Sequence, residues 1–366
     1  MSTYTSEDLR VALRHGIAQV SPPMPDLPDV RRRRSRARAR RATAGLLVAA
    51  SLVAGTFVLA RHTPELVDRP DRFGFAQQGP LDLSQGAQAY GVDGKVLHIG
   101  GNTYDWPSTI GLDTQAVATS WGLVFPDGRG RPQLLGRDGE VTLLDDSPAD
   151  AVRDFHPSIQ WSPATGQIAY ALTYDGTVSL HLRSLDDGTA ESIDLACTGS
   201  CEDVRVDAVD SERVFVSTSD GTTMWRADQD GDQLVSFAGK GTRVVDARNK
   251  VLLYAGNEEP SPLEGWRYVQ GRADDELTFD GSHVLGWSSV LRSTDGSAPI
   301  VLEQGARSLK GGPVSFFTLD TDGSVLVARA VEYPEFEVYD CAVPSGTCQF
   351  LRREKSGDPV FIGNDS

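Results

Sequence analysis

The chain has 366 residues, of which 39% are hydrophobic and 23% are charged. This composition is typical of a globular protein and not of a disordered or fibrous one, and the length suits two ordinary domains or one large β architecture. Residues 1–41 carry ten arginines and four acidic residues, a balance of +6, so residues 42–366 carry −22 of the total of −16. A basic N-terminal segment therefore precedes a strongly acidic body.

Residues 1–21 contain a stretch with the period of a helix, residues 5–20. Its apolar positions fall on one stripe, which includes Leu9, Leu13, Ile17 and Val20. We predict a short amphipathic helix, which is only marginally stable in water by itself. It either lies on a membrane surface, frays in solution, or docks a cytoplasmic partner.

Residues 22–41 form a predicted linker, first rich in proline and then rich in arginine. The proline-rich part is expected to be an extended spacer. The arginine run lies directly before an apolar segment, where anionic lipid headgroups attract such clusters, so we expect membrane-surface contact and no nucleic-acid binding. The run comprises Arg31, Arg32, Arg33, Arg34, Arg36, Arg38, Arg40 and Arg41.

Residues 42–60 are uncharged and are bounded by Arg41 and Arg61. As a helix this stretch would be roughly 28 Å long, close to the thickness of the bilayer hydrocarbon. We predict a single transmembrane helix. Because the arginines precede it, the N-terminus is expected in the cytoplasm and the rest of the chain outside the cell membrane.

A cleaved secretory signal is the alternative interpretation, with a small-residue site ending at Ala60 and a twin-arginine pair at Arg40 and Arg41. The uncharged stretch exceeds the usual 7 to 15 residues of a signal core. An uncleaved anchor is therefore favoured, followed by a juxtamembrane linker at 61–80.

Residues 81–366 are rich in glycine, aspartate and short β-branched or aromatic runs. Asp-Gly between apolar runs is a strong hairpin signal, because the turn needs positive φ angles that these residues tolerate. The body is therefore predicted to be mostly antiparallel β. The pairs begin at Asp93, Asp127, Asp138, Asp175, Asp187, Asp220, Asp230, Asp280, Asp295 and Asp322.

These runs recur as a unit of strands and turns, seven times in roughly 285 residues or about 41 residues per unit, the spacing of four-stranded propeller blades. We predict an all-β, seven-bladed β-propeller, with six or eight blades as the margin of error. Two β-sandwich domains are the competing architecture, but they would not show one period throughout. The units lie at 88–110, 116–147, 158–195, 203–237, 242–277, 278–306 and 315–351.

One unit carries a specific motif, Trp161-Ser162-Pro163 followed by a glycine at 166 and the strand Ile168-Ala169-Tyr170. It resembles the repeat of the WD40-like, TolB-type propellers, although the other units lack the proline turn. The order of segments also resembles bacterial single-pass membrane proteins with a short basic cytoplasmic tail and an extracytoplasmic propeller. The resemblance implies the fold and not an activity, since propellers serve as enzymes, lectins and scaffolds.

All four cysteines follow the predicted membrane span, in an oxidising location. We predict two local disulfides, Cys197 with Cys201 and Cys341 with Cys348, because each close pair can bridge its own turn. A zinc site that uses all four is the alternative. It is disfavoured because the two pairs fall on the third and seventh units, which a ring holds apart.

The sequence contains no HExxH, GxSxG or GxxxxGK[ST] motif, so no catalytic residue and no cofactor is predicted. Asp228, Asp230 and Asp232 resemble the start of a calcium loop, but Gly239 stands where such a loop needs a glutamate. They are interpreted as an acidic hairpin tip, with a weak calcium site as the alternative. The six tryptophans occur about once per unit and are expected in blade cores.

Three functional hypotheses follow. The first is a membrane-anchored propeller that binds a protein or cell-envelope partner without catalysis. The second is a transmembrane signalling regulator of anti-sigma-like layout, whose helix at 5–20 docks a cytoplasmic factor, although the zinc-binding His/Cys motif of such proteins is missing. The third is an extracytoplasmic hydrolase with a site at the mouth of the propeller.

Overall fold

The computed structural model describes residues 80–105, 116–147, 158–195, 204–211, 213–227, 233–304, 307–309, 315–332, 334–355 and 357–362. The predicted cytoplasmic helix, arginine run and transmembrane helix lie outside these ranges. Within them, no helix has the length and hydropathy needed to cross a membrane.

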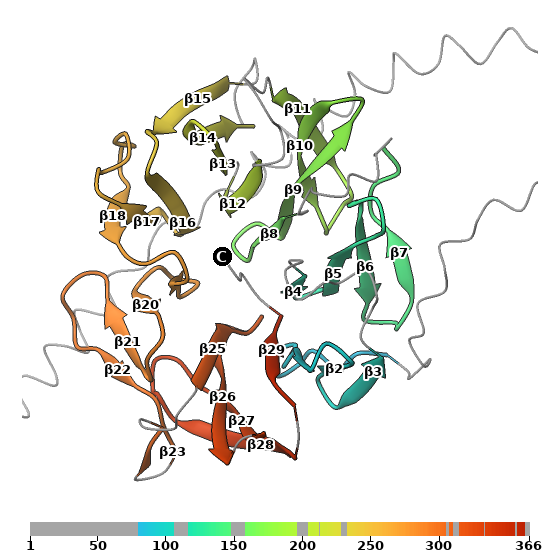
Figure 1. Ribbon diagram of the computed structural model, residues 1–366, viewed down its shortest axis with the longest axis vertical. Helices are drawn as coiled ribbons and strands as arrows, with labels where there is room; N and C mark the ends of the chain where they lie inside the picture. The colour runs from blue at the N-terminus through green and yellow to red at the C-terminus, as the bar shows by residue number, and fades with distance from the viewer. Residues whose placement is uncertain are drawn as a thin grey trace, which may run out of the picture. The chain divides into compact units, whose positions relative to one another are not determined.

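The described strands form seven blade-like sheets arranged in a ring (Figure 1), so the predicted seven-bladed propeller is confirmed. In each of these blades the first-named strand is the innermost. Blade 1 contains β29 (Pro359–Phe361), β1 (Tyr90–Val92), β2 (Val96–Ile99) and β3 (Asn102–Asp105). Blade 2 contains β4 (Val117–Thr119), β5 (Gly122–Pro126), β6 (Pro132–Gly136) and β7 (Val141–Leu143). Blade 3 contains β8 (Ile159–Ser162), β9 (Gln167–Tyr174), β10 (Thr177–Ser184) and β11 (Ala190–Leu195).

The second half of the chain continues the ring. Blade 4 contains β12 (Arg205–Asp210), β13 (Arg213–Thr218), β14 (Gly221–Arg226) and β15 (Gln233–Ala238). Blade 5 contains β16 (Thr242–Arg248), β17 (Val251–Gly256) and β18 (Arg267–Gln270). Blade 6 contains β19 (Glu276–Leu277), β20 (His283–Leu285), β21 (Val290–Ser293) and β22 (Ile300–Val301). A small hairpin of β23 (Glu303–Gln304) and β24 (Arg307–Ser308) precedes blade 7, which contains β25 (Ser315–Leu319), β26 (Val325–Glu332), β27 (Glu335–Cys341) and β28 (Cys348–Glu354).

Asp-Gly pairs form the hairpin turns that the sequence predicts. Asp93 and Gly94 have φ angles of +55° and +60°, and Asp175 and Gly176 have +48° and +75°. These pairs follow β1 and β9 and turn the chain into β2 and β10. Positive φ at both positions is what a type I′ hairpin turn requires.

Two unit boundaries predicted from the sequence were wrong. Blade 1 takes its innermost strand, β29, from the C-terminal end of the chain, where it pairs with β1. The predicted unit 242–277 also ran too far, because residues 276–277 form the innermost strand of blade 6. In blade 5, β18 runs parallel to β17, so the connection over residues 257–266 must return along the sheet.

The apolar core lies between the blades. Each of the seven buried clusters in the described residues combines side chains from two neighbouring blades. Trp225, for example, is fully buried among residues of blades 3 and 4. Since a blade buries its faces only against its neighbours, each blade depends on the ring for its stability.

Polar side chains join the inner parts of neighbouring blades by accepting backbone N–H groups. At the junction of blades 7 and 1, Asp320 accepts the N–H groups of Ala87 and Gln88, both at 2.8 Å. Burial raises the pKa of Asp320 to about 6. Similar links run from Ser158 to Val206 N at 2.6 Å, from Asp246 to Leu277 N at 2.9 Å and from Glu276 to Leu319 N at 3.2 Å.

In two blades, a buried tyrosine and histidine on the two middle strands meet a carboxylate from the neighbouring blade. In blade 3, Tyr170 of β9 stacks on its register partner His181 of β10, with ring centroids 5.0 Å apart and an interplanar angle of 7°. Asp145, which follows the outer strand of blade 2, accepts the Tyr170 hydroxyl, and its Oδ2 lies 3.3 Å from His181 Nδ1. The carboxylate thus ties blade 2 to blade 3.

Blade 1 repeats this arrangement. Tyr90 of β1 packs against its register partner His98 of β2, with centroids 4.7 Å apart. Glu354, at the end of β28 in blade 7, accepts the Tyr90 hydroxyl at 3.0 Å and lies 3.4 Å from His98 Nε2. Burial lowers the pKa of both His98 and His181 below the usual 6.5.

We expect Gly86→Ala to weaken the junction of blades 7 and 1. Gly86 has a φ of +84°, and a Cβ there would lie 2.2 Å from Asp320 Oδ2. Backbone strain and the clash should together lower the free energy of unfolding by about 2 kcal/mol or more. Gly128→Ala is the control, because a Cβ there meets no atom within 4 Å. Denaturant unfolding that shows equal stability for both variants would contradict this assignment.

We also expect the two buried histidines to make folding sensitive to mild acid. Because their pKa is lower in the folded state, the unfolded chain binds more protons below about pH 6.5, and stability falls as the pH drops through this region. Each histidine changes the free energy of unfolding by at most about 1.4 kcal/mol per pH unit. Unfolding measured from pH 7.5 to 5 should therefore show a shallower dependence for the His98→Phe/His181→Phe variant. Asp320, with its raised pKa, acts in the opposite direction in both proteins and cancels in the difference. Identical slopes for both proteins would refute this role of the histidines.

Candidate functional site

Side chains from blades 3, 5 and 6 meet beside the central channel, near the C-terminal ends of the inner strands. Arg248, the last residue of β16, donates from Nη1 to the Trp161 carbonyl on blade 3 at 2.8 Å and pairs with Asp246 at 3.0 Å. Its guanidinium lies 5.5 Å from the centroid of Phe279, whose ring meets Trp161 edge-on at 5.7 Å. The remaining cavity at this level measures about 20 Å³, which is room for about one water molecule.

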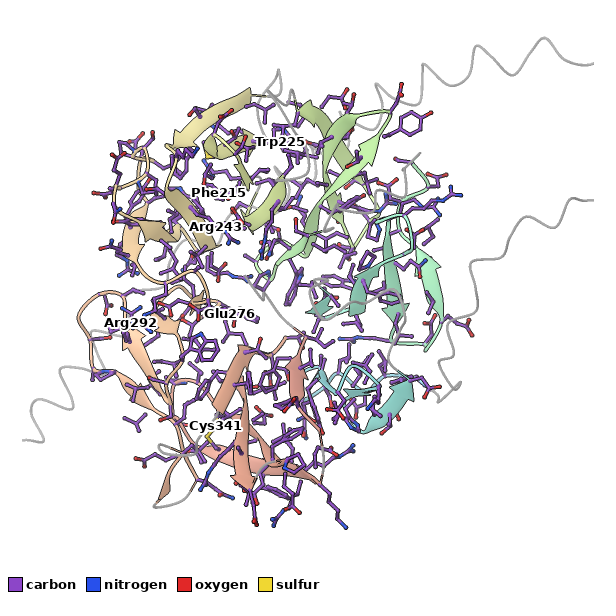
Figure 2. The ribbon with its side chains drawn as sticks, viewed as in Figure 1. Phe215, Trp225, Arg243, Glu276, Arg292 and Cys341 are labelled. Carbon is purple, nitrogen blue, oxygen red and sulfur yellow. A yellow bond between two sulfur atoms is a disulfide. The ribbon has the colours of Figure 1, made fainter. Side chains whose placement is uncertain are left out.

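A larger pocket, here called the mouth pocket, lies toward the opposite ends of the inner strands. It has a volume of about 360 Å³ and is formed by blades 6, 7 and 1. It is lined by Phe316 and Phe317 near the start of β25, by the closing strand β29, and by residues 285–287, from the end of β20 into the loop that follows it. Glu276, the first residue of β19, lies at the inner side of blade 6 near the channel (Figure 2).

Trp287 is the most exposed large apolar side chain in the described part of the chain, at 62% of its surface. It lies in the loop between β20 and β21, with its ring centroid 6.3 Å from that of Phe316. Gly286 allows the loop to approach Asp275, the residue before β19, because a Cβ at position 286 would lie 2.6 Å from Asp275 Oδ1. An exposed indole on a pocket is typical of a contact surface.

The expected location of tryptophans in blade cores is therefore correct for Trp225 and wrong for Trp287. Trp225 is on a strand and fully buried, whereas Trp287 is in a loop and exposed. Trp161, in the motif at 161–163, is buried in the cluster between blades 2 and 3 and also contacts Phe279 beside the channel.

The mouth pocket is acidic. Its charged lining residues are Asp274, which is exposed, and Glu276, which is 8% exposed and accepts the Leu319 N–H. Among its described lining residues there is no lysine, arginine or histidine. A ligand here therefore meets aromatic rings and negative charge.

A second pocket, here called the side pocket, shares Gly286 and Trp287 with the mouth pocket and has a volume of about 490 Å³. It lies between blades 5 and 6 and contains Arg272 and Arg292. Arg292 donates to Asp275 at 2.8 Å, and its side chain is 55% exposed (Figure 2). The side pocket thus carries two guanidinium groups against one carboxylate.

The residues that the sequence singled out lie elsewhere. The predicted disulfide between Cys341 and Cys348 is present and joins the end of β27 to the start of β28. Cys197, Cys201 and the acidic positions 228, 230 and 232 lie outside the described residues. Within the described ranges, no group of three or more His, Cys, Asp or Glu side chains is placed to hold a metal ion.

Sequence reasoning did not find the mouth pocket. Its lining residues lie at 274–287, 316–317 and 359–361, so no linear motif joins them. The available signal was a tryptophan followed by two serines within a turn segment, 286–289, instead of a β-branched run. That signal marks Trp287 as a loop residue and leaves its pocket partners unknown.

No family model matches this chain, and no curated protein matches it. Among solved structures, AztD from Citrobacter koseri aligns at 11% identity and a TM-score of 0.42, covering 74% of this chain and 95% of AztD. A putative TolB from Agrobacterium tumefaciens aligns at 14% identity and a TM-score of 0.27, covering 77% and 82%. The WD40 repeats of RRP9 align at 10% identity and a TM-score of 0.36, covering 75% and 85%. What this chain shares with these proteins is a distant likeness of propeller architecture.

Proposed function

We propose that this protein is a binding module whose propeller takes its ligand at the mouth pocket. The observation that supports this best is Trp287, an indole exposed at 62% beside a pocket of about 360 Å³. Aromatic side chains with polar neighbours in a concave site are the usual composition of binding pockets. Among the described lining residues there is no Ser, Thr, Cys, Lys or His, and the polar side chains are the carboxylates Asp274 and Glu276.

A photoreactive phenylalanine placed at position 287 of the full-length chain in cells tests this proposal. We expect irradiation to give a discrete crosslinked product, because the ligand would contact this side chain. The same probe at position 174 is the control, since Tyr174 is similarly exposed at 53% but lies at the end of β9 in blade 3. Equal products from both positions, or no product from position 287, would refute a ligand site at the mouth pocket.

We also propose that residues 42–60 anchor the propeller at the outer face of the cell membrane. The support is the uncharged stretch itself and the eight arginines before it. Residues 5–20 would then be cytoplasmic, where their apolar stripe is available to a cytoplasmic factor or to the membrane surface. The partner of the propeller would be a protein or a polymer of the cell envelope.

Leu52→Arg tests the anchor, because a charge at the centre of the span costs about 2.5 to 3.5 kcal/mol on insertion scales. We expect the full-length variant to leave the alkali-resistant membrane fraction, in which the unaltered chain should remain. Ser2→Arg, far from the span, is the control. If the unaltered chain is itself recovered in the soluble fraction, the proposed anchor is wrong.

A further inference from the structure

We infer that the mouth pocket recognises a basic peptide segment, with a lysine or arginine side chain inserted beside Trp287. This inference rests on the proposed function, since it assumes that the mouth pocket is the binding site. It goes further by naming the chemical class of the ligand. Three features of the described residues support it: the exposed aromatic ring, the sign of the charges that line the pocket, and the opposite charge balance of the side pocket.

The aromatic side of the pocket suits a cation on an apolar stem. Trp287 and Phe316 lie 6.3 Å apart with their rings inclined at 52°, so they form two walls. A cation over the face of an indole is attracted by the ring's negative face, and tryptophan binds cations better than tyrosine or phenylalanine. The methylene groups of a lysine or arginine would pack against Phe316 and Leu285.

The charged side of the pocket favours the same ligand. Asp274 and Glu276 are both carboxylates, and no basic side chain is among the described residues that line the pocket. Hydrogen bonding to the Leu319 N–H helps to hold the Glu276 carboxylate in place. The net charge of −22 on residues 42–366 would also raise the local concentration of basic ligands.

The side pocket indicates how a peptide would lie. It shares Trp287 with the mouth pocket, so an extended segment can cross the indole from one pocket to the other. The side pocket has a net positive charge, because Arg272 and Arg292 outnumber Asp275. This charge disfavours a second cation and suits backbone carbonyl or carboxylate groups. The basic side chain therefore belongs in the mouth pocket, and the adjoining backbone belongs in the side pocket.

The experiment is calorimetric titration of the detergent-solubilised full-length chain with three probes. The first is a short Gly/Ser peptide with three lysines, the second is the same peptide with acetylated lysines, and the third is neutral chitotetraose. We expect the lysine peptide to bind, and acetylation to weaken binding at least about tenfold. Added salt should weaken the binding of the lysine peptide, because its charges become screened.

Variants connect the binding to the mouth pocket. Trp287→Ala and Asp274→Asn should each weaken the binding of the lysine peptide several-fold. Asp274→Asn should also reduce the salt dependence of that binding. The matched controls are Tyr174→Ala, which removes an exposed aromatic ring from blade 3, and Asp186→Asn, which removes one exposed carboxylate from the same blade. Both controls should bind like the unaltered chain.

Two kinds of result would overturn the inference. The first is equal binding of the acetylated peptide, or equal effects of the pocket variants and their controls. The second is no binding of the lysine peptide. If chitotetraose instead binds in a manner that depends on Trp287, the mouth pocket is a binding site but its ligand is a neutral sugar. The photocrosslinking at position 287 decides independently whether the pocket is occupied at all.

Discussion

The pairing of β29 with β1 is the constraint on which the rest of the structure depends. Each apolar cluster is shared by two neighbouring blades, so a blade can bury both faces only when the ring is closed. The strands that close the ring are three residues long, and such a pairing has little stability of its own. Side chains reinforce the same junction: Asp320 binds two backbone N–H groups before β1, and Glu354 reaches the Tyr90 hydroxyl. These hydrogen bonds thus reinforce the junction at which the first and last strands of the propeller meet.

The candidate site also depends on the pairing that closes the ring. β29 both completes blade 1 and lines the mouth pocket, while blades 6 and 7 supply Trp287 and Phe316. Arg248 contacts both Trp161 and Phe279 nearer the C-terminal ends of the inner strands. A ligand held by three blades would bind the closed ring and not the unfolded chain. By mass action it would therefore stabilise the fold.

Acidic residues have two distinct environments in this propeller. Asp246 is buried and paired with Arg248, and Asp207 is buried and accepts two donors from Arg243 at 2.8 and 2.7 Å. Burial raises the pKa of Asp207 while Arg243 acts against that shift. These carboxylates hold neighbouring strands together, since removing one member of a buried pair is costly. Asp274 is instead exposed at the mouth pocket, where its charge is available to a ligand.

The sequence by itself determined the features that depend on residues close in the chain. Asp-Gly turns with positive φ, the blade spacing of about 41 residues and the Cys341–Cys348 disulfide are all local, and the structure confirms them. The tertiary structure alone decided which strand completes blade 1, how Tyr, His and carboxylate groups meet across two blades, and which residues surround Trp287. Turn chemistry and alternation act over a few residues, whereas contacts between residues more than 200 positions apart, such as Ala87 with Asp320, exist only once the ring closes.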